Sequence, residues 1–177
     1  EQLVEALRDV PGVASAGMIN HLPIAGDEWR MPVHIEGQRV ARPGEGIRAT
    51  YRVVMPGYLE TMRIPLEHGR GITDADRGTA APVVVVNAAF ARAHWAGEDP
   101  IGRRITLDDP ASGAWLTVVG VTRDVIRAAW TESPAEEIYV PYLQSPLYLE
   151  SRGPHVAYMT VVARAACARG DACDASR

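Results

Sequence analysis

The stretch from residue 83 to residue 97, VVVVNAAFARAHWAG, decides the fold class of this chain. A run of four valines bounded by turn residues is typical of a buried strand. Asn87 follows the run directly, and an asparagine side chain commonly caps the first turn of a helix. Residues 88–95 have a helical composition, and Gly97 favours a stop. The stretch therefore predicts a strand that runs straight into a helix.

Around this unit the pattern favours further short strands. Residues 32–37 alternate, with Val33 and Ile35 on one face and His34 on the other, so His34 is expected to face solvent. We expect this strand to pair with residues 47–55. Further strands are predicted at residues 13–19, 104–107, 115–121, 138–142 and 156–163.

Helices are expected to be few and short. The first covers residues 3–10, with an apolar stripe of Leu3, Ala6, Leu7 and Val10. Two more brief helices are predicted, at residues 56–62 and from residue 73. Residues 68–71 read as a tight turn and residues 144–154 as a loop. No internal repeat is present, and this mixture predicts an α+β fold.

The composition describes a chain that can bury a core, with 177 residues, 47% of them apolar and 23% charged. One domain or two small ones are expected. A formal net charge of -4 without a basic cluster argues against nucleic acid as a partner. The longest aliphatic run is far shorter than the ~20 residues of a membrane span. Because the chain opens without Met or a leader pattern, we expect it to be a piece of a longer protein.

No motif predicts catalysis, so we expect no enzyme, no cofactor and no metal. Ser15 does not fit Gly-x-Ser-x-Gly, because one residue too many separates it from Gly12. The histidines stand singly, at His21, His34, His68, His94 and His155. For His94 we expect a half-buried, hydrogen-bonded imidazole. Structural roles are also expected for the acidic pairs Asp74/Asp76, Asp108/Asp109 and Glu136/Glu137.

The two cysteines, Cys167 and Cys173, lie six residues apart in a polar tail. A disulfide that closes this short loop is one alternative in an oxidising compartment. A metal pair is the other, but zinc sites usually show tighter spacing and a second pair of ligands, and none follows here. Thiols without a functional role are the simplest interpretation.

Six stretches follow one another in a distinctive order along the chain. They are VPGVASA (10–16), RVVMPGYLETMRIPLEHGR (52–70), PVVVVN (82–87), WAGEDPIGRRI (95–105), WLTVVGVTRDV (115–125) and EIYVPY (137–142). In that order they resemble one family, the periplasmic core domain of MacB/FtsX-type ABC transporter permeases. The resemblance covers about residues 1–163.

The resemblance implies a mixed α/β porter-like subdomain, residues 1–55 plus 156–163, interrupted by an inserted β-rich lobe, residues 56–155. Residues 164–177 are expected to form a frayed tail. The family normally continues into a further helix and strand, so we expect an incomplete porter-like subdomain with an uncovered apolar face. The implied location is the periplasmic (extracytoplasmic) face of the bacterial inner membrane.

The function implied is that of a non-catalytic domain that transmits motion and docks a partner or substrate during export. The implied partners are the membrane-embedded remainder of the permease, a periplasmic adaptor or lipoprotein, and a second copy in a homodimer. The alternative is an extracytoplasmic domain that binds a small molecule, lipid or peptide near Trp29, Trp115 or Trp130. For these tryptophans we favour core packing over ligand binding.

Overall fold

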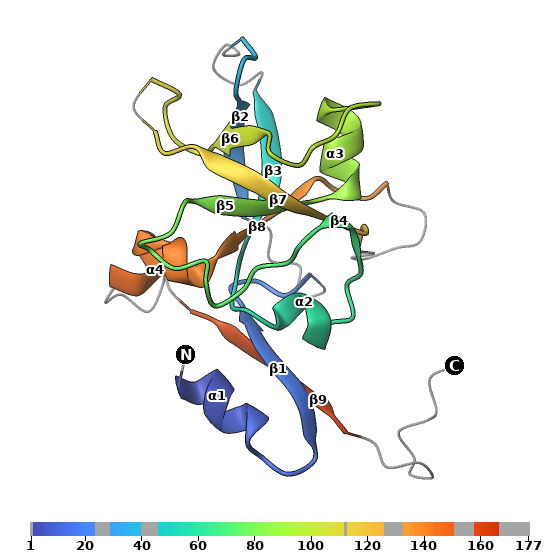
Figure 1. Ribbon diagram of the computed structural model, residues 1–177, viewed down its shortest axis with the longest axis vertical. Coiled ribbons are helices and arrows are strands. Elements are labelled where there is room, and N and C mark those ends of the chain that lie inside the picture. Colours follow the sequence, from blue (N-terminus) through green and yellow to red (C-terminus); the bar gives the residue numbers. More distant parts are fainter. Residues whose placement is uncertain are drawn as a thin grey trace.

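The computed structural model describes residues 2–23, 29–39, 46–111, 113–125, 133–150 and 158–166 (Figure 1). The strands are β1 Val13–Ile19, β2 Arg30–Ile35, β3 Ile47–Val54, β4 Leu66–Gly69, β5 Val83–Asn87, β6 Arg104–Thr106, β7 Leu116–Thr122, β8 Glu137–Pro141 and β9 Thr160–Ala165. The helices are α1 Gln2–Arg8, α2 Tyr58–Thr61, α3 Ala88–His94 and α4 Pro146–Glu150, with the 3-10 helix η2 Tyr142–Gln144.

All of these strands join one mixed sheet in the order β2-β6-β7-β5-β8-β3-β1-β9, and β4 pairs with β7. The pairs β3/β8 and β5/β7 are parallel, and the other pairs are antiparallel. The sheet is flanked by short helices, which confirms the predicted α+β class. The predicted pairing of residues 32–37 with residues 47–55 is confirmed by the β2/β3 ladder.

The strand-to-helix unit forms as predicted. Every residue of β5 is buried, and the Phe90 N–H donates to Asn87 Oδ1 (3.0 Å), which caps α3. Phe90 and Trp95 pack into the larger of two apolar clusters. The smaller cluster surrounds α2 and contains Tyr58 and Leu59.

One end of the molecule is formed by α1, β1 and β9, which we call the chain-end unit. β1 and β9 pair from Val13 to Ile19, and α1 packs on β1. By contrast, β1 meets β3 at a single register pair, Ile19 with Val54. The ribbon of β1 and β9 therefore extends away from the remaining strands, β2 to β8, which we call the main sheet (Figure 1).

Strands from both sides of the predicted boundary at residue 55 share the main sheet. β3 pairs with β8, and β2 pairs with β6. Strand pairing alone does not separate the two parts. The division into a porter-like subdomain, residues 1–55 plus 156–163, and an inserted lobe, residues 56–155, stays a prediction.

The apolar stripe predicted for the first helix is wrong. Val4 is the buried residue of α1, whereas Leu3 is 55% exposed and Val10 is 46% exposed. The face that meets β1 is therefore not the face that the spacing predicted. The uncovered apolar face expected for an incomplete porter-like subdomain stays a prediction. No helix in the described ranges has the length and apolar character needed to cross a membrane.

Three other local predictions are corrected. Residues 68–71 are not a tight turn, because His68 and Gly69 pair with β7 as part of β4. Residues 73–76 form a turn without a helix. The predicted loop at residues 144–154 contains α4, since Pro146 suits the first helical position.

The last strand lies later than predicted. β9 begins at Thr160 and ends at Ala165, so Arg164 and Ala165 belong to a strand and not to a frayed tail. His34, expected at the surface, is half-buried. Cys167, Cys173 and His155 lie outside the described residues.

Candidate functional site

The short helix α2 lies between the chain-end unit and the main sheet. Tyr58 is 0% exposed and Leu59 is 4% exposed, and both pack with Ile19 and Tyr139. On the other side α2 meets β1 at Gly17, where an added Cβ would lie 2.6 Å from Tyr58 Cα. Contacts from both parts of the molecule therefore converge on α2.

A fully buried ion pair lies below α2 in the main sheet. Arg52 Nη2 of β3 is 3.1 Å from Glu137 Oε1 of β8, and the two side chains are 0% and 1% exposed. The Tyr139 hydroxyl donates to Glu137 Oε2 (2.7 Å). Arg52 Nη1 donates to the His21 carbonyl (2.7 Å), just after β1. The guanidinium thus ties three segments together.

Burial raises the pKa of the Tyr139 phenol well above its usual value, and the Glu137 carboxylate raises it further. Burial also raises the pKa of Tyr58, although the positive charge of Arg52 opposes this effect. Both phenols therefore stay protonated, and Tyr139 remains a hydrogen-bond donor to Glu137.

Asn20 forms a second buried polar centre at the end of β1. Its Oδ1 accepts the N–H groups of His21 (2.8 Å) and Val53 (3.0 Å), and its Nδ2 donates to the Tyr148 hydroxyl (3.0 Å). Asn20 is 0% exposed. The amide therefore continues the pairing of β1 with β3 by side-chain bonds.

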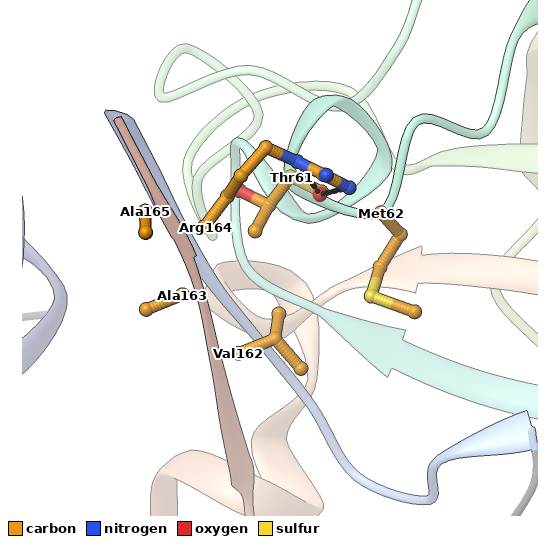
Figure 2. Close-up of a pocket in the computed structure, with 6 residues that line it drawn as sticks. All are labelled: Thr61, Met62, Val162, Ala163, Arg164 and Ala165. Carbon is orange, nitrogen blue, oxygen red and sulfur yellow. Dashed lines mark hydrogen bonds between the residues drawn. The ribbon is translucent and has the colours of Figure 1, made fainter. Parts of the chain in front are cut away.

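A groove of about 290 Å³ opens to solvent between α2 and β9 (Figure 2). Its walls come from Thr61, Met62, Val162, Ala163, Arg164 and Ala165. Arg164 supplies its only charged side chain, and Nε and Nη2 of that residue donate to the Thr61 carbonyl at 2.9 and 2.7 Å. The groove thus lacks the convergent polar groups of a small-molecule site.

His94, Glu136 and Glu137 make structural contacts. The His94 side chain is 16% exposed and its Nε2 lies 2.7 Å from Glu136 Oε2, which confirms the expected half-buried, hydrogen-bonded imidazole. Glu137 points instead to Arg52, as consecutive residues of an extended chain do. No group of three metal-ligating side chains occurs among the residues that the structure describes.

Asp76 closes the turn that precedes β5. Both of its carboxylate oxygens accept bonds from Arg70 at 2.8 Å, and Oδ2 also accepts the Thr73 N–H. Burial raises the pKa of Asp76, but the bonds from Arg70 and Thr73 outweigh it and lower the pKa overall. Asp109 similarly accepts the Ala111 N–H within its own loop.

Trp29 belongs to an aromatic cluster at the junction of the two parts. Its ring meets His21 edge-on with centroids 5.8 Å apart, and His21 meets Tyr158 at 5.0 Å. Trp29 is 38% exposed and Tyr158 is 43% exposed. Core packing, the interpretation favoured for Trp29, is therefore wrong for this residue.

Trp115 lies elsewhere, with Arg104 over its ring at 5.9 Å. The register of β2, β6 and β7 places it near His34. His34 is five residues along β2 from Trp29, or about 16 Å. The structure therefore does not bring Trp29 and Trp115 together, and Trp130 lies outside the described residues.

Sequence reasoning missed the arginines of this junction, Arg8, Arg52 and Arg164. The sequence could have indicated the role of Arg52. A charged residue inside a strand, next to Val53 and Val54, predicts a buried side chain with a partner of opposite charge. For Arg8 and Arg164 the acceptors are backbone carbonyls, which leave no trace in the sequence.

The chain was compared with known proteins. Residues 1–172 match the family described as MacB-like periplasmic core domain. No curated protein matches the chain by sequence. The periplasmic region of MacB from Actinobacillus actinomycetemcomitans is similar in structure, with a TM-score of 0.61 and 15% identity over 92% of this chain and 62% of that one. The extracellular domain of the ABC-type transporter YknZ from Gram-positive bacteria gives a TM-score of 0.60 and 18% identity over 95% and 73%.

These structural likenesses show the same fold, and the chain spans less than two thirds of the MacB region. The family match covers nearly the whole chain and confirms both the resemblance found in the sequence and the predicted extracytoplasmic location. The chain therefore belongs to the MacB-like periplasmic core domain family, the family of extracytoplasmic domains of ABC transporter permeases.

Proposed function

We propose that this chain is a non-catalytic domain that transmits motion from the membrane-embedded part of a permease to a partner or substrate outside the membrane. The carrying observation is the thin connection between the two parts of the fold. Ile19 and Val54 form the only register pair between β1 and β3 in the described residues. A unit that shares so few ladder bonds with its neighbour, and is joined to it mainly by side-chain contacts, can be displaced as a body.

The use of the charged groups supports a non-catalytic role. Glu137 is paired with Arg52 and accepts a hydrogen bond from Tyr139. Glu136 is paired with His94, and Asp76 is paired with Arg70. A catalytic group needs a polar atom directed at a substrate. These carboxylates instead hold strands and turns together.

Membership of this family implies the membrane-embedded remainder of the permease as a partner. As further partners we propose a second copy of the domain and a periplasmic adaptor or lipoprotein. Leu147 and Leu149 of α4 are each 50% exposed and support an outward contact surface.

A flexible insertion in the turn between α1 and β1 tests the transmission of motion. Four Gly-Ser residues after Gly12 lengthen this connection, and a Cβ added to Gly12 would meet no atom within 4 Å. The intact permease, with Cys167 and Cys173 replaced by serine, carries a spin label at Glu98→Cys and a second label in its membrane domain. We expect ATP to change the distance between the labels in the parent protein and not in the insertion variant, because slack in the turn absorbs the displacement.

The matched control is the same insertion after Gly37, in the turn beyond β2, where an added Cβ would likewise meet no atom within 4 Å. This turn follows a strand of the main sheet and lies outside the chain-end unit, so the ATP-driven distance change should persist. Transmission through the chain-end unit is refuted if the Gly12 insertion leaves the distance change intact, or if ATP causes no change in the parent protein.

The aromatic cluster of His21, Trp29 and Tyr158 favours a second candidate, an extracytoplasmic binding domain. Exposed aromatic rings at a junction offer stacking surface to a small molecule, lipid or peptide. A ligand stabilises the fold by RT ln(1 + [L]/Kd), about 2.7 kcal/mol at 100 times Kd.

Thermal unfolding in the presence of lysolipids, small amphiphiles and short peptides tests this candidate. A true ligand should raise Tm in the parent chain and lose most of that effect in Trp29→Ala. Trp115→Ala is the control and should keep the full shift, since Trp115 lies near His34, which is about 16 Å along β2 from Trp29. If no probe raises Tm, or both variants respond like the parent, the binding role fails.

A further inference from the structure

Two arginines grip α2 from opposite ends. At its beginning, Arg8 Nη2 donates to the Pro56 carbonyl (2.7 Å), and Nε and Nη2 of Arg8 also donate to the Ala16 carbonyl (3.2 and 3.0 Å). At its end, Arg164 Nε and Nη2 donate to the Thr61 carbonyl (2.9 and 2.7 Å), as the dashed lines in Figure 2 show. A helix of four residues is thus held by two guanidinium groups.

Both arginines come from the chain-end unit. Arg8 lies in the last turn of α1, and Arg164 lies in β9. They are 48 and 103 residues away in sequence from the carbonyls of Pro56 and Thr61. Displacement of either α1 or β9 would therefore pull on α2 directly.

Arg8 also binds the edge of β1 at a point where β3 no longer pairs with it. The Met18 carbonyl accepts the Met55 N–H on that edge. The Ala16 carbonyl, two residues earlier, points the same way. The Ala16 carbonyl accepts its hydrogen bond from Arg8, at a position where a longer β3 would otherwise donate one. The side chain thus replaces the missing ladder bond and joins α1, β1 and the start of α2.

From α2 the contact continues into the main sheet. Tyr58 is 0% exposed and packs with Val85 of β5 and Tyr139 of β8. Its phenol also lies in the field of the buried charges of Arg52 and Glu137. α2 is therefore rigidly seated on one side and gripped by arginines on the other.

We propose that Arg8 and Arg164 are positioning residues that make α2 the coupling element between the chain-end unit and the main sheet. Each guanidinium fixes one end of α2. The stabilisation that one arginine gives to α2 therefore depends on the presence of the other. The meaning of this coupling for transport rests on the proposed function, but the coupling itself is a property of the chain.

Amide hydrogen exchange in the full 177-residue chain tests the proposal. The N–H groups of Thr61 and Met62, bonded to the carbonyls of Gly57 and Tyr58, report the opening of α2. The fully buried valines of β5 report global unfolding and serve as the reference. We expect Arg8→Ala and Arg164→Ala each to raise α2 exchange about tenfold relative to β5, as the loss of a charge-assisted hydrogen bond does.

The double variant separates coupling from independent support. The two guanidinium groups share no acceptor, so independent effects multiply, to about 100-fold. Coupled positioning predicts a clearly smaller increase, close to that of the single variants. A multiplicative result, or single variants that change α2 and β5 alike, overturns the proposal.

Two further variants keep the test interpretable. Arg123→Ala removes an arginine that is 68% exposed and 3.7 Å from Glu67, and it should leave α2 exchange unchanged. Arg8→Lys and Arg164→Lys apply if the alanine variants do not fold, since an ammonium group cannot reproduce the planar fork. The lysine pair should show the same less-than-multiplicative behaviour.

The outcome is independent of the proposed function. A coupled exchange pattern together with a normal ATP-driven distance change after the Gly12 insertion would keep the coupling role of the arginines and reject the transmission of motion. A multiplicative exchange pattern together with loss of the distance change would do the reverse.

Discussion

Arg52→Ala is expected to lower the free energy of unfolding by about 3–5 kcal/mol, because it leaves the buried Glu137 carboxylate without its counter-ion. The two side chains are 0% and 1% exposed, so water cannot replace the lost partner. The His21 carbonyl also loses its bond from Arg52 Nη1. Urea denaturation of the parent chain and the variant, followed by circular dichroism, measures the difference.

The matched control is Arg104→Ala. Arg104 also pairs with a glutamate, Glu36, but their side chains are 46% and 44% exposed. An exposed ion pair contributes about 0–1 kcal/mol, so this variant should unfold almost like the parent. Equal losses for both variants would contradict the importance that we assign to burial.

A double replacement distinguishes charge from packing. Arg52→Met combined with Glu137→Leu removes both charges and keeps most of the volume. Because a buried pair replaced by apolar side chains is often neutral, this variant should recover part of the loss. Recovery stays incomplete, since the Tyr139 hydroxyl loses its acceptor. A double variant less stable than Arg52→Ala would contradict this account.

The location of the ion pair explains why a buried charge is useful here. Arg52 and Tyr139 are register partners in the parallel pair of β3 and β8. A slip of one residue would turn the guanidinium to the opposite face of the sheet, away from Glu137. The pair therefore fixes the register where β3 also meets the chain-end unit.

Local sequence signals predicted the elements that depend on neighbours along the chain. Four consecutive valines and the capping side chain of Asn87 sufficed for β5 and α3, because both signals act within a few residues. β1 was predicted with its observed bounds, since the Pro11-Gly12 turn marks its start.

Long-range partners account for what the sequence could not show. The partner of Arg52 is 85 residues away, and His68 becomes a strand residue through pairing with Val121. Which face of α1 packs on β1 depends on contacts between the two elements. The spacing of apolar residues within α1 does not determine it. The junction at α2 likewise arises from segments 48 and 103 residues apart in sequence.

Gly17→Val is the second variant with a large expected effect, a loss of about 3 kcal/mol in the free energy of unfolding. An added Cβ at this position would lie 2.6 Å from Tyr58 Cα and 2.9 Å from Tyr58 N. Both are backbone atoms of α2, so a rotamer change cannot relieve the overlap. α2 must move away from β1, and urea denaturation would record the cost.

Gly71→Ala is the matched control, because Gly71 is also buried but its nearest neighbour would be the side-chain atom Glu60 Oε1 at 3.6 Å. That distance is an ordinary contact, so stability should change by less than about 1 kcal/mol. Hydrogen exchange of Thr61 and Met62 should rise in Gly17→Val beyond the rise in β5, since the overlap acts on α2 first. A Gly17→Val chain as stable as Gly71→Ala would contradict the close packing of α2 against β1.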